Sequence, residues 1–146
     1  MSAVTEIAAT RCLGDYTCAQ AVLCAFCGEA GLSEDLALKI APGLGAGMGR
    51  KQEVCGAVTA SILVLGLRRG RDSTGDRSAA ELSYLKTREA MDRFAAQHGS
   101  WLCRELLQGY DLGTEDGLRR AKADDVVNEV CRPCVQTVVE ILEDVQ

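Results

Sequence analysis

Cysteine is the residue type in this chain with the clearest chemical potential, because a thiolate can bind a metal ion or attack a disulfide. Eight of the 146 residues are cysteines. They are Cys12, Cys18, Cys24, Cys27, Cys55, Cys103, Cys131 and Cys134. A reducing cytoplasm keeps such residues as thiols unless they bind metal or take part in redox reactions. We therefore expect the function of the protein to depend on some of them.

Four of these cysteines follow, by three residues, a side chain that could begin a helix. The pairs are Asp15 and Cys18, Gln52 and Cys55, Ser100 and Cys103, and Asn128 and Cys131. Asp, Ser and Asn are favoured N-caps, so a cysteine three residues later lies in the first helical turn. There the free backbone N–H groups and the positive end of the helix dipole favour thiolate over thiol. For Cys131 the helix could instead begin at Arg132 or Pro133, because proline suits a first turn.

A glycine-rich stretch, "GLGAGMG" at residues 43–49, lies shortly before Cys55. Every second residue is glycine, which permits unusual backbone conformations and lets N–H groups approach an anion closely. We expect this loop to direct N–H groups toward the start of the helix that follows Cys55. A phosphate-binding loop is less consistent with the residues, because Gly-Lys-Ser/Thr and a preceding strand are both missing.

Four segments together resemble a known protein family. They read "YTCAQAVLCAF", "GLGAGMGRKQEVCGAVTASILVLGL", "HGSWLCRELLQGYDL" and "CRPCVQTVVEIL". With them the chain resembles the C_GCAxxG_C_C family of redox-active proteins, a module also found in split-Soret cytochromes. The resemblance places the four hallmark cysteines at Cys18, Cys55, Cys103 and Cys131. It implies that these residues bind an iron–sulfur cluster, with [2Fe-2S] the favoured type.

The chain departs from the family pattern in two respects. The family's CGAxxG ends here as "CGAVTA", with Ala60 in place of the last glycine. Cys12, Cys24, Cys27 and Cys134 are additional to the four hallmark cysteines. Neither "CAFCG" nor "CRPCV" contains the histidine of a c-type haem attachment site, so no haem is implied.

The residues themselves leave other kinds of site open. Four thiolates from separate helices suit a [2Fe-2S] cluster, a [4Fe-4S] cluster or a tetrahedral zinc ion. Structural zinc sites usually use close pairs of ligands, so the scattered positions favour iron and make structural zinc an alternative. Another alternative is a thiol–disulfide redox protein that uses pairs of the hallmark cysteines or Cys131 with Cys134, since "CRPC" resembles the thioredoxin dithiol. Cys24 and Cys27 are interpreted as packing residues, because free cysteine usually behaves as a small hydrophobe.

The elements that must position these cysteines are predicted to be helices. "SEDLALKI" begins with Ser33 as an N-cap. The stretch 78–99 opens with Ser78 and Glu81 at capping-box spacing and closes with Gly99, a typical residue just beyond a helix end. Beside it, His98 is expected to satisfy terminal carbonyls as an imidazolium rather than to bind metal.

Apolar residues recur at helical spacing in two segments and predict buried stripes. The stripes are Ala80, Tyr84, Thr87, Met91 and Phe94 in one segment, and Val135, Val138, Val139, Leu142 and Val145 in the other. Further helices are expected over 18–31, ending at Gly28 or Gly31, and from Val54 onward. Residues 68–78 and 113–125 look like polar loops or frayed helix. We therefore expect one all-α domain over residues 1–146, a bundle of about five to seven helices.

Composition narrows the classes of partner. The net charge of −5 and the lack of a basic cluster argue against nucleic acid. The apolar run 54–67 is shorter than the roughly 20 residues of a membrane span, so no membrane insertion is expected. No export signal is apparent, which suggests the cytoplasm. An electron carrier there needs a redox partner protein, whose identity the sequence does not give, and a homodimer stays open.

Overall fold

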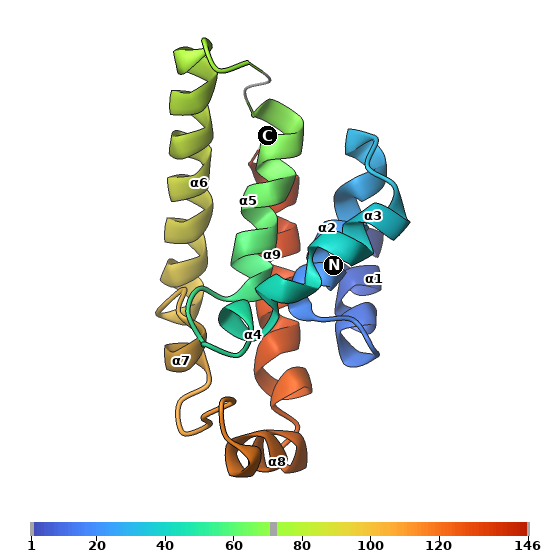
Figure 1. Cartoon of the computed structure of the whole chain (residues 1–146), viewed down its shortest axis with the longest axis vertical. Helices are drawn as coiled ribbons and strands as arrows, with labels where there is room; N and C mark the ends of the chain where they lie inside the picture. Colours follow the sequence, from blue (N-terminus) through green and yellow to red (C-terminus); the bar gives the residue numbers. More distant parts are fainter. Residues whose placement is uncertain (1, 71–72, 146) are drawn as a thin grey trace.

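The computed structural model describes residues 2–70 and 73–145, apart from the side chains of residues 12, 13 and 30. Within these ranges the chain forms helices joined by short connections (Figure 1). The α-helices are α1 (Ala3–Leu13), α2 (Cys18–Phe26), α3 (Glu34–Ile40), α4 (Gly45–Met48), α5 (Gly56–Arg69), α6 (Arg77–His98), α7 (Cys103–Leu106), α8 (Glu115–Ala123) and α9 (Arg132–Asp144). Two 3-10 turns, η1 (Cys27–Ala30) and η2 (Pro42–Leu44), and a π-helical turn, η3 (Val127–Cys131), complete the set.

Helix α5 lies at the centre of the arrangement, with α2, α6 and α9 packed against it (Figure 1). Helix α1 packs on α2 and α9. The buried face of α5 consists largely of small side chains such as Ala57, Ala60 and Val64, each at most 1% exposed. Short side chains allow helix axes to approach closely. The core is therefore built from aliphatic residues, in agreement with a composition that has only 4% aromatic residues.

The prediction of an all-α fold is confirmed for the described residues, which contain no strand and only one isolated bridge. The number of helices slightly exceeds the predicted five to seven. The difference arises from short elements such as α4 and α7, each four residues long. A single turn is too short to show an apolar repeat in the sequence. None of the helices in these ranges is both long and apolar enough to cross a membrane.

Several predicted helix boundaries are confirmed. Ser33 caps α3 by accepting a hydrogen bond from the backbone of Leu36. The segment after α2 ends at Gly31, which has a left-handed φ of 74°. Gly99 likewise ends α6 with a φ of 85°. All five C-terminal stripe residues are at most 2% exposed, so α9 packs on the core as expected.

Helix α6 differs from its prediction in two respects. Its N-cap is Asp76, which accepts from the backbone N–H of Ala79, whereas Ser78 lies inside the helix and donates to Asp76. Tyr84, predicted to be buried, is 60% exposed, and the fully buried positions are Ala90 and Phe94. The early turns of α6 extend along the outer end of α5 (Figure 1). Because few other elements reach that end, apolar periodicity there does not produce burial.

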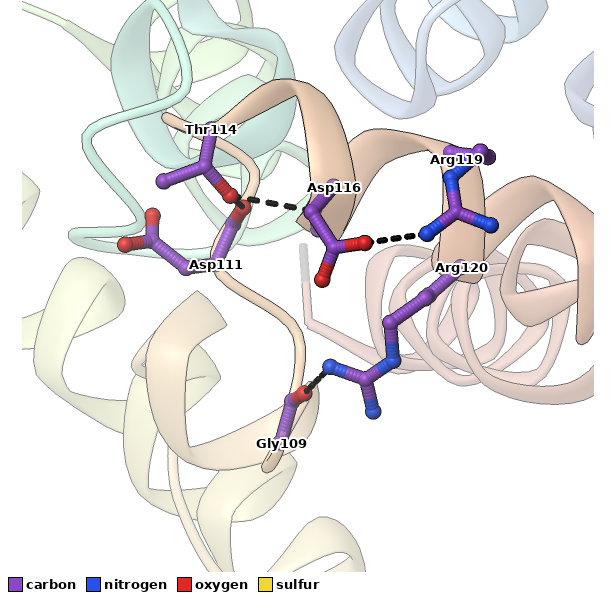
Figure 2. Close-up of polar contacts among 7 residues, drawn as sticks. Gly109, Asp111, Thr114, Asp116, Arg119 and Arg120 are labelled. Atoms are coloured by element: carbon purple, nitrogen blue, oxygen red, sulfur yellow. Dashed lines mark hydrogen bonds and ion pairs between the residues drawn. The ribbon is translucent and has the colours of Figure 1, made fainter.

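The polar stretch 113–125, expected to be loop or frayed helix, contains the regular helix α8. Thr114 caps it, accepting from the N–H of Gly117 at 3.0 Å and donating to the carbonyl of Asp111 at 3.0 Å. Arg120 donates to the carbonyl of Gly109 at 3.1 Å. Figure 2 shows these contacts joining α8 to the preceding loop. They hold α8 in place over the site described next.

Candidate functional site

Five cysteines line one cavity of about 410 Å³. They are Cys18, Cys55, Cys103, Cys131 and Cys134. The set includes all four cysteines singled out in the sequence, although they lie far apart along the chain. Helices α2, α5, α7 and α9 each contribute a cysteine at or near their first residue. The expected convergence of sulfurs from several helix starts is therefore observed, and their role as ligands stays a prediction.

Cys18 is the first residue of α2, but Asp15 is not its cap as predicted. Thr17 is the N-cap and forms a capping box with Gln20. The Thr17 hydroxyl accepts from the N–H of Gln20 at 3.2 Å, and the Gln20 side chain accepts from the N–H of Thr17 at 3.0 Å. This reciprocal pair satisfies two backbone donors, more than an aspartate cap alone could do.

Cys55 and Cys103 are held near each other by a short backbone pairing. The N–H of Cys55 donates to the carbonyl of Trp101 at 2.8 Å. The N–H of Cys103 donates to the carbonyl of Glu53 at 2.6 Å. An antiparallel bridge thus joins the segment before α5 to the segment before α7. The amino-acid sequence gives no sign of this pairing, because one bridge produces no alternating pattern.

The other predicted caps are also wrong by a few residues. Cys55 itself is the N-cap of α5, and Leu102 is the N-cap of α7. Gln52 points elsewhere, donating to the carbonyl of Tyr110 and accepting from the N–H of Leu112, both at 2.9 Å. Gln52 therefore anchors the loop that precedes α8, and this loop forms one wall of the cavity.

Cys131 and Cys134 belong to the last helical segment. Cys131 ends η3 and is the N-cap of α9, so Asn128 lies in η3 and caps nothing. Cys134 is the third residue of α9 and is 2% exposed. Residues three apart lie on the same side of a helix, so both cysteines face the cavity. This spacing is the sequence signal that could have placed Cys134 at the site, whereas the sequence pattern was interpreted as giving it a role only in the alternative dithiol with Cys131.

The glycine-rich loop forms a left-handed turn. Its residues Ala46, Gly47, Met48, Gly49 and Arg50 all have φ between 53° and 69°. A Cβ atom at Gly47 would lie 2.6 Å from the backbone of residues 52 and 53, so only glycine fits there. The turn brings the backbone N–H of Ala46 to the sulfur of Cys18. The predicted N–H donation toward a cysteine is therefore found, but at Cys18 rather than at the start of α5.

Three of the sulfurs form a chain of hydrogen bonds from Cys18 through Cys55 to Cys134. The hydrogen bond to Cys55, and then burial, raise the pKa of Cys18 well above its ordinary value. The hydrogen bond to Cys134 is the main cause of the raised pKa of Cys55. Burial, followed by the nearby charge of Cys18, raises the pKa of Cys103 to about 11.

At Cys18, Cys55 and Cys103 these shifts contradict the expectation that helix starts favour thiolates. Backbone N–H groups do lower the pKa values, those of Ala46 and Ala19 at Cys18 and that of Ala57 at Cys55. Sulfur–sulfur hydrogen bonds and removal from water outweigh them, because both favour the neutral thiol. The thiols of Cys18, Cys55 and Cys103 are therefore protonated at neutral pH in the metal-free protein.

The walls of the cavity are largely apolar. They include Leu106, Leu107, Leu112, Leu118 and Val130. Charged residues also line it, at Arg50, Lys122 and Asp125. Its surroundings therefore limit the access of water to the sulfurs.

Two further cysteines lie outside the cavity. Cys24 and Cys27 are 7% and 6% exposed within the helical core, and the thiol of Cys27 donates to the carbonyl of Cys24 at 3.3 Å. Neither lines the cavity, in agreement with a packing role. The side chain of Cys12 lies outside the described residues.

No group of His, Cys, Asp or Glu side chains in residues 2–70 and 73–145 is arranged ready to hold a metal ion. The cavity nevertheless gathers five thiols.

Comparison with known proteins places the chain in a family. The sequence model described as "Putative redox-active protein (C_GCAxxG_C_C)" matches residues 16–145. Comparisons with curated proteins and with solved structures give no significant match. Because the family match covers most of the chain and includes all five cysteines of the cavity, the protein belongs to the C_GCAxxG_C_C family of redox-active proteins.

Proposed function

We propose that Cys18, Cys55, Cys103 and Cys131 bind an iron–sulfur cluster, with [2Fe-2S] the favoured type, and that the protein transfers single electrons. The observation that carries the proposal is the meeting of all four cysteines at one cavity. The proposal includes a redox partner protein and a reducing compartment such as the cytoplasm, where thiols stay available for ligation.

The donor set fits such a cluster. Iron–sulfur clusters are held by cysteine thiolates, and the cavity offers four hallmark sulfurs with mainly apolar walls. Backbone N–H groups reach two of the proposed ligands, Ala46 to Cys18 and Ala57 to Cys55. Hydrogen bonds to ligand sulfurs and limited solvent access are main influences on cluster potential. A bound cluster would supply one-electron chemistry.

Binding of a cluster first requires the cysteine thiols to release their protons. Because Cys18, Cys55 and Cys103 are thiols in the metal-free protein, ligation must release their protons, and affinity should rise with pH. The hydrogen bonds that join Cys18, Cys55 and Cys134 must also break. The backbone N–H groups that already point at the sulfurs would then stabilise the thiolates formed.

The test is metal analysis of protein purified without oxygen. Iron with acid-labile sulfide and a visible thiolate-to-iron absorption band would support the proposal. The variant C55S should lose the colour and the iron. The matched variant C24S should keep both, because Cys24 is buried away from the cavity. Equal loss in both variants would refute the ligand assignment, and zinc alone would indicate a structural zinc site.

A thiol–disulfide redox protein is the second candidate. The hydrogen bonds from Cys18 through Cys55 to Cys134 favour it, because thiols in contact can form a disulfide after small movements. Protein that binds no metal but closes and reopens a disulfide at a defined potential would support this candidate instead.

A further inference from the structure

Cys134 is the cysteine of the cavity that the family's four-cysteine pattern does not include. It lies one helical turn after Cys131 and is 2% exposed. Its sulfur accepts a hydrogen bond from the thiol of Cys55, which is 7% exposed at the start of α5. The contact joins α5 to α9, two helices that pack against each other.

Cys18 also contacts Cys55, but its sulfur is held by other groups. It receives the backbone N–H groups of Ala46 and Ala19. It also lies against Gly56, where a Cβ atom would be only 2.6 Å away. A shift of Cys18 into bonding distance of Cys55 would disturb all of these contacts. Cys134 is therefore the better partner for a bond to Cys55.

We propose that Cys55 and Cys134 form a reversible disulfide in the metal-free protein. The proposal concerns the metal-free protein and does not require that the cavity bind a cluster at other times. It does connect the two candidate functions, because Cys55 cannot serve as a thiolate ligand while it is bonded to Cys134. The disulfide would thus close the metal site under oxidising conditions and reopen it on reduction.

The oxidant is a small-molecule disulfide. The sulfur of Cys55, the more exposed of the two, attacks it and releases one small thiol, leaving a mixed disulfide on Cys55. Cys134 then attacks the Cys55 sulfur and releases the second small thiol. In total two protein thiols give two electrons and two protons to the small disulfide, which leaves as two thiols. A reducing dithiol reverses both steps.

The experiment uses the full-length metal-free chain and hydroxyethyl disulfide, a small neutral reagent. After reaction, free thiols are blocked and the protein is digested with trypsin without reduction. Cys55 falls in the peptide 52–68, while Cys131 and Cys134 share the peptide 123–146 because trypsin does not cut before Pro133. We expect these two peptides to be linked.

Variants identify the second sulfur. C131S should keep the link between the two peptides, and C134A should lose it. Alanine is chosen at position 134 because its side chain suits apolar surroundings. C27S is the control, since Cys27 is also buried, at 6% exposed, but does not line the cavity. Circular dichroism of each variant checks that it folds. The reagent should raise the melting temperature of the wild type and of C27S but not of C134A, because a disulfide restricts the unfolded chain.

Two results would overturn the inference. One is a Cys55 peptide linked mainly to residues 12–39, which contain Cys18. The other is a link to 123–146 that survives in C134A and disappears in C131S. Iron and sulfide binding are measured separately on protein that has not been treated with hydroxyethyl disulfide. Failure of the disulfide would thus leave the cluster proposal standing, and failure of the cluster proposal would leave the disulfide standing.

Discussion

The sulfur of Cys18 lies against Gly56, the first residue of α5, with no room for a side chain between them. A Cβ atom at Gly56 would be 2.6 Å from the Cys18 sulfur and 2.8 Å from the carbonyl oxygen of Leu44. Both distances are shorter than non-bonded contacts allow. The glycine that follows Cys55 therefore lets the start of one helix rest on the cysteine that begins another. This contact gives a physical reason for the Cys-Gly pair in the sequence.

The variant G56A should displace Cys18 and destabilise the protein by about 1–3 kcal/mol, the usual cost of overpacking. Urea unfolding measures the loss, and metal content measures the effect on the site. G66A in the same helix is the control, because its Cβ would meet nothing within 4 Å. At that exposed helical position alanine should stabilise by about 0.5–1 kcal/mol. Similar effects of the two changes would show that the Cys18 contact is not close.

Gly47 and Gly49 allow a second matched comparison within the left-handed turn. Both have positive φ, 67° and 60°. Only Gly47 is also crowded, with backbone atoms of Gln52 and Glu53 within 2.7 Å of a Cβ position. G49A should lower the free energy of unfolding by about 1–2 kcal/mol through backbone strain alone. G47A should lower the free energy of unfolding by clearly more, which denaturant unfolding measures. It should also weaken the N–H contact to Cys18. A larger loss in G49A would contradict the observed crowding.

The sequence predicted the parts of the fold that depend on local signals. Ser33, Gly99 and the apolar stripe of α9 each follow from capping preference or periodicity, and the structure confirms them. The four cysteines were also found from spacing and resemblance, and they meet at one cavity. Local patterns were sufficient for these features because neighbouring residues determine them. They were not sufficient at the cysteine helices, where none of the predicted caps is the N-cap observed.

Features that depend on distant parts of the chain could not be predicted in this way. The exposure of Tyr84 depends on which elements reach the outer end of α6. The contact between Cys55 and Cys134 joins residues in two different helices. The protonation of the thiols also went against the local expectation, because burial and neighbouring sulfurs act through the tertiary structure.

Gln52 should be essential for the wall formed by the loop before α8. Its side chain satisfies the carbonyl of Tyr110 and the N–H of Leu112 and is itself 7% exposed. Q52A leaves both groups without this partner. The free energy of unfolding should fall by about 1–3 kcal/mol for each group that stays buried. Hydrogen exchange at Leu112 and through α8 should become faster. Q108A is the control, because Gln108 is exposed in a nearby segment, and equal acceleration in both variants would contradict the anchoring role.

His98 should make stability depend on pH in a defined direction. It was expected to act as an imidazolium at the end of α6, but its Nε2 atom lies 2.8 Å from the hydroxyl of Thr137 and its ring stacks on Phe94 at 4.7 Å. Burial lowers its pKa below the ordinary 6.5. A base with a lowered folded-state pKa stabilises the fold above its unfolded pKa, and that contribution is lost as pH falls below about 6.5.

The pH effect of His98 can be isolated by comparing the wild type with H98Q. The two proteins share every other titratable group, so the difference between them reports the imidazole. The urea midpoint of the wild type should fall further between pH 8 and pH 5 than that of H98Q, because glutamine stays neutral throughout that range. Parallel decreases in the two proteins would mean that His98 takes up its proton equally well in the folded and unfolded states.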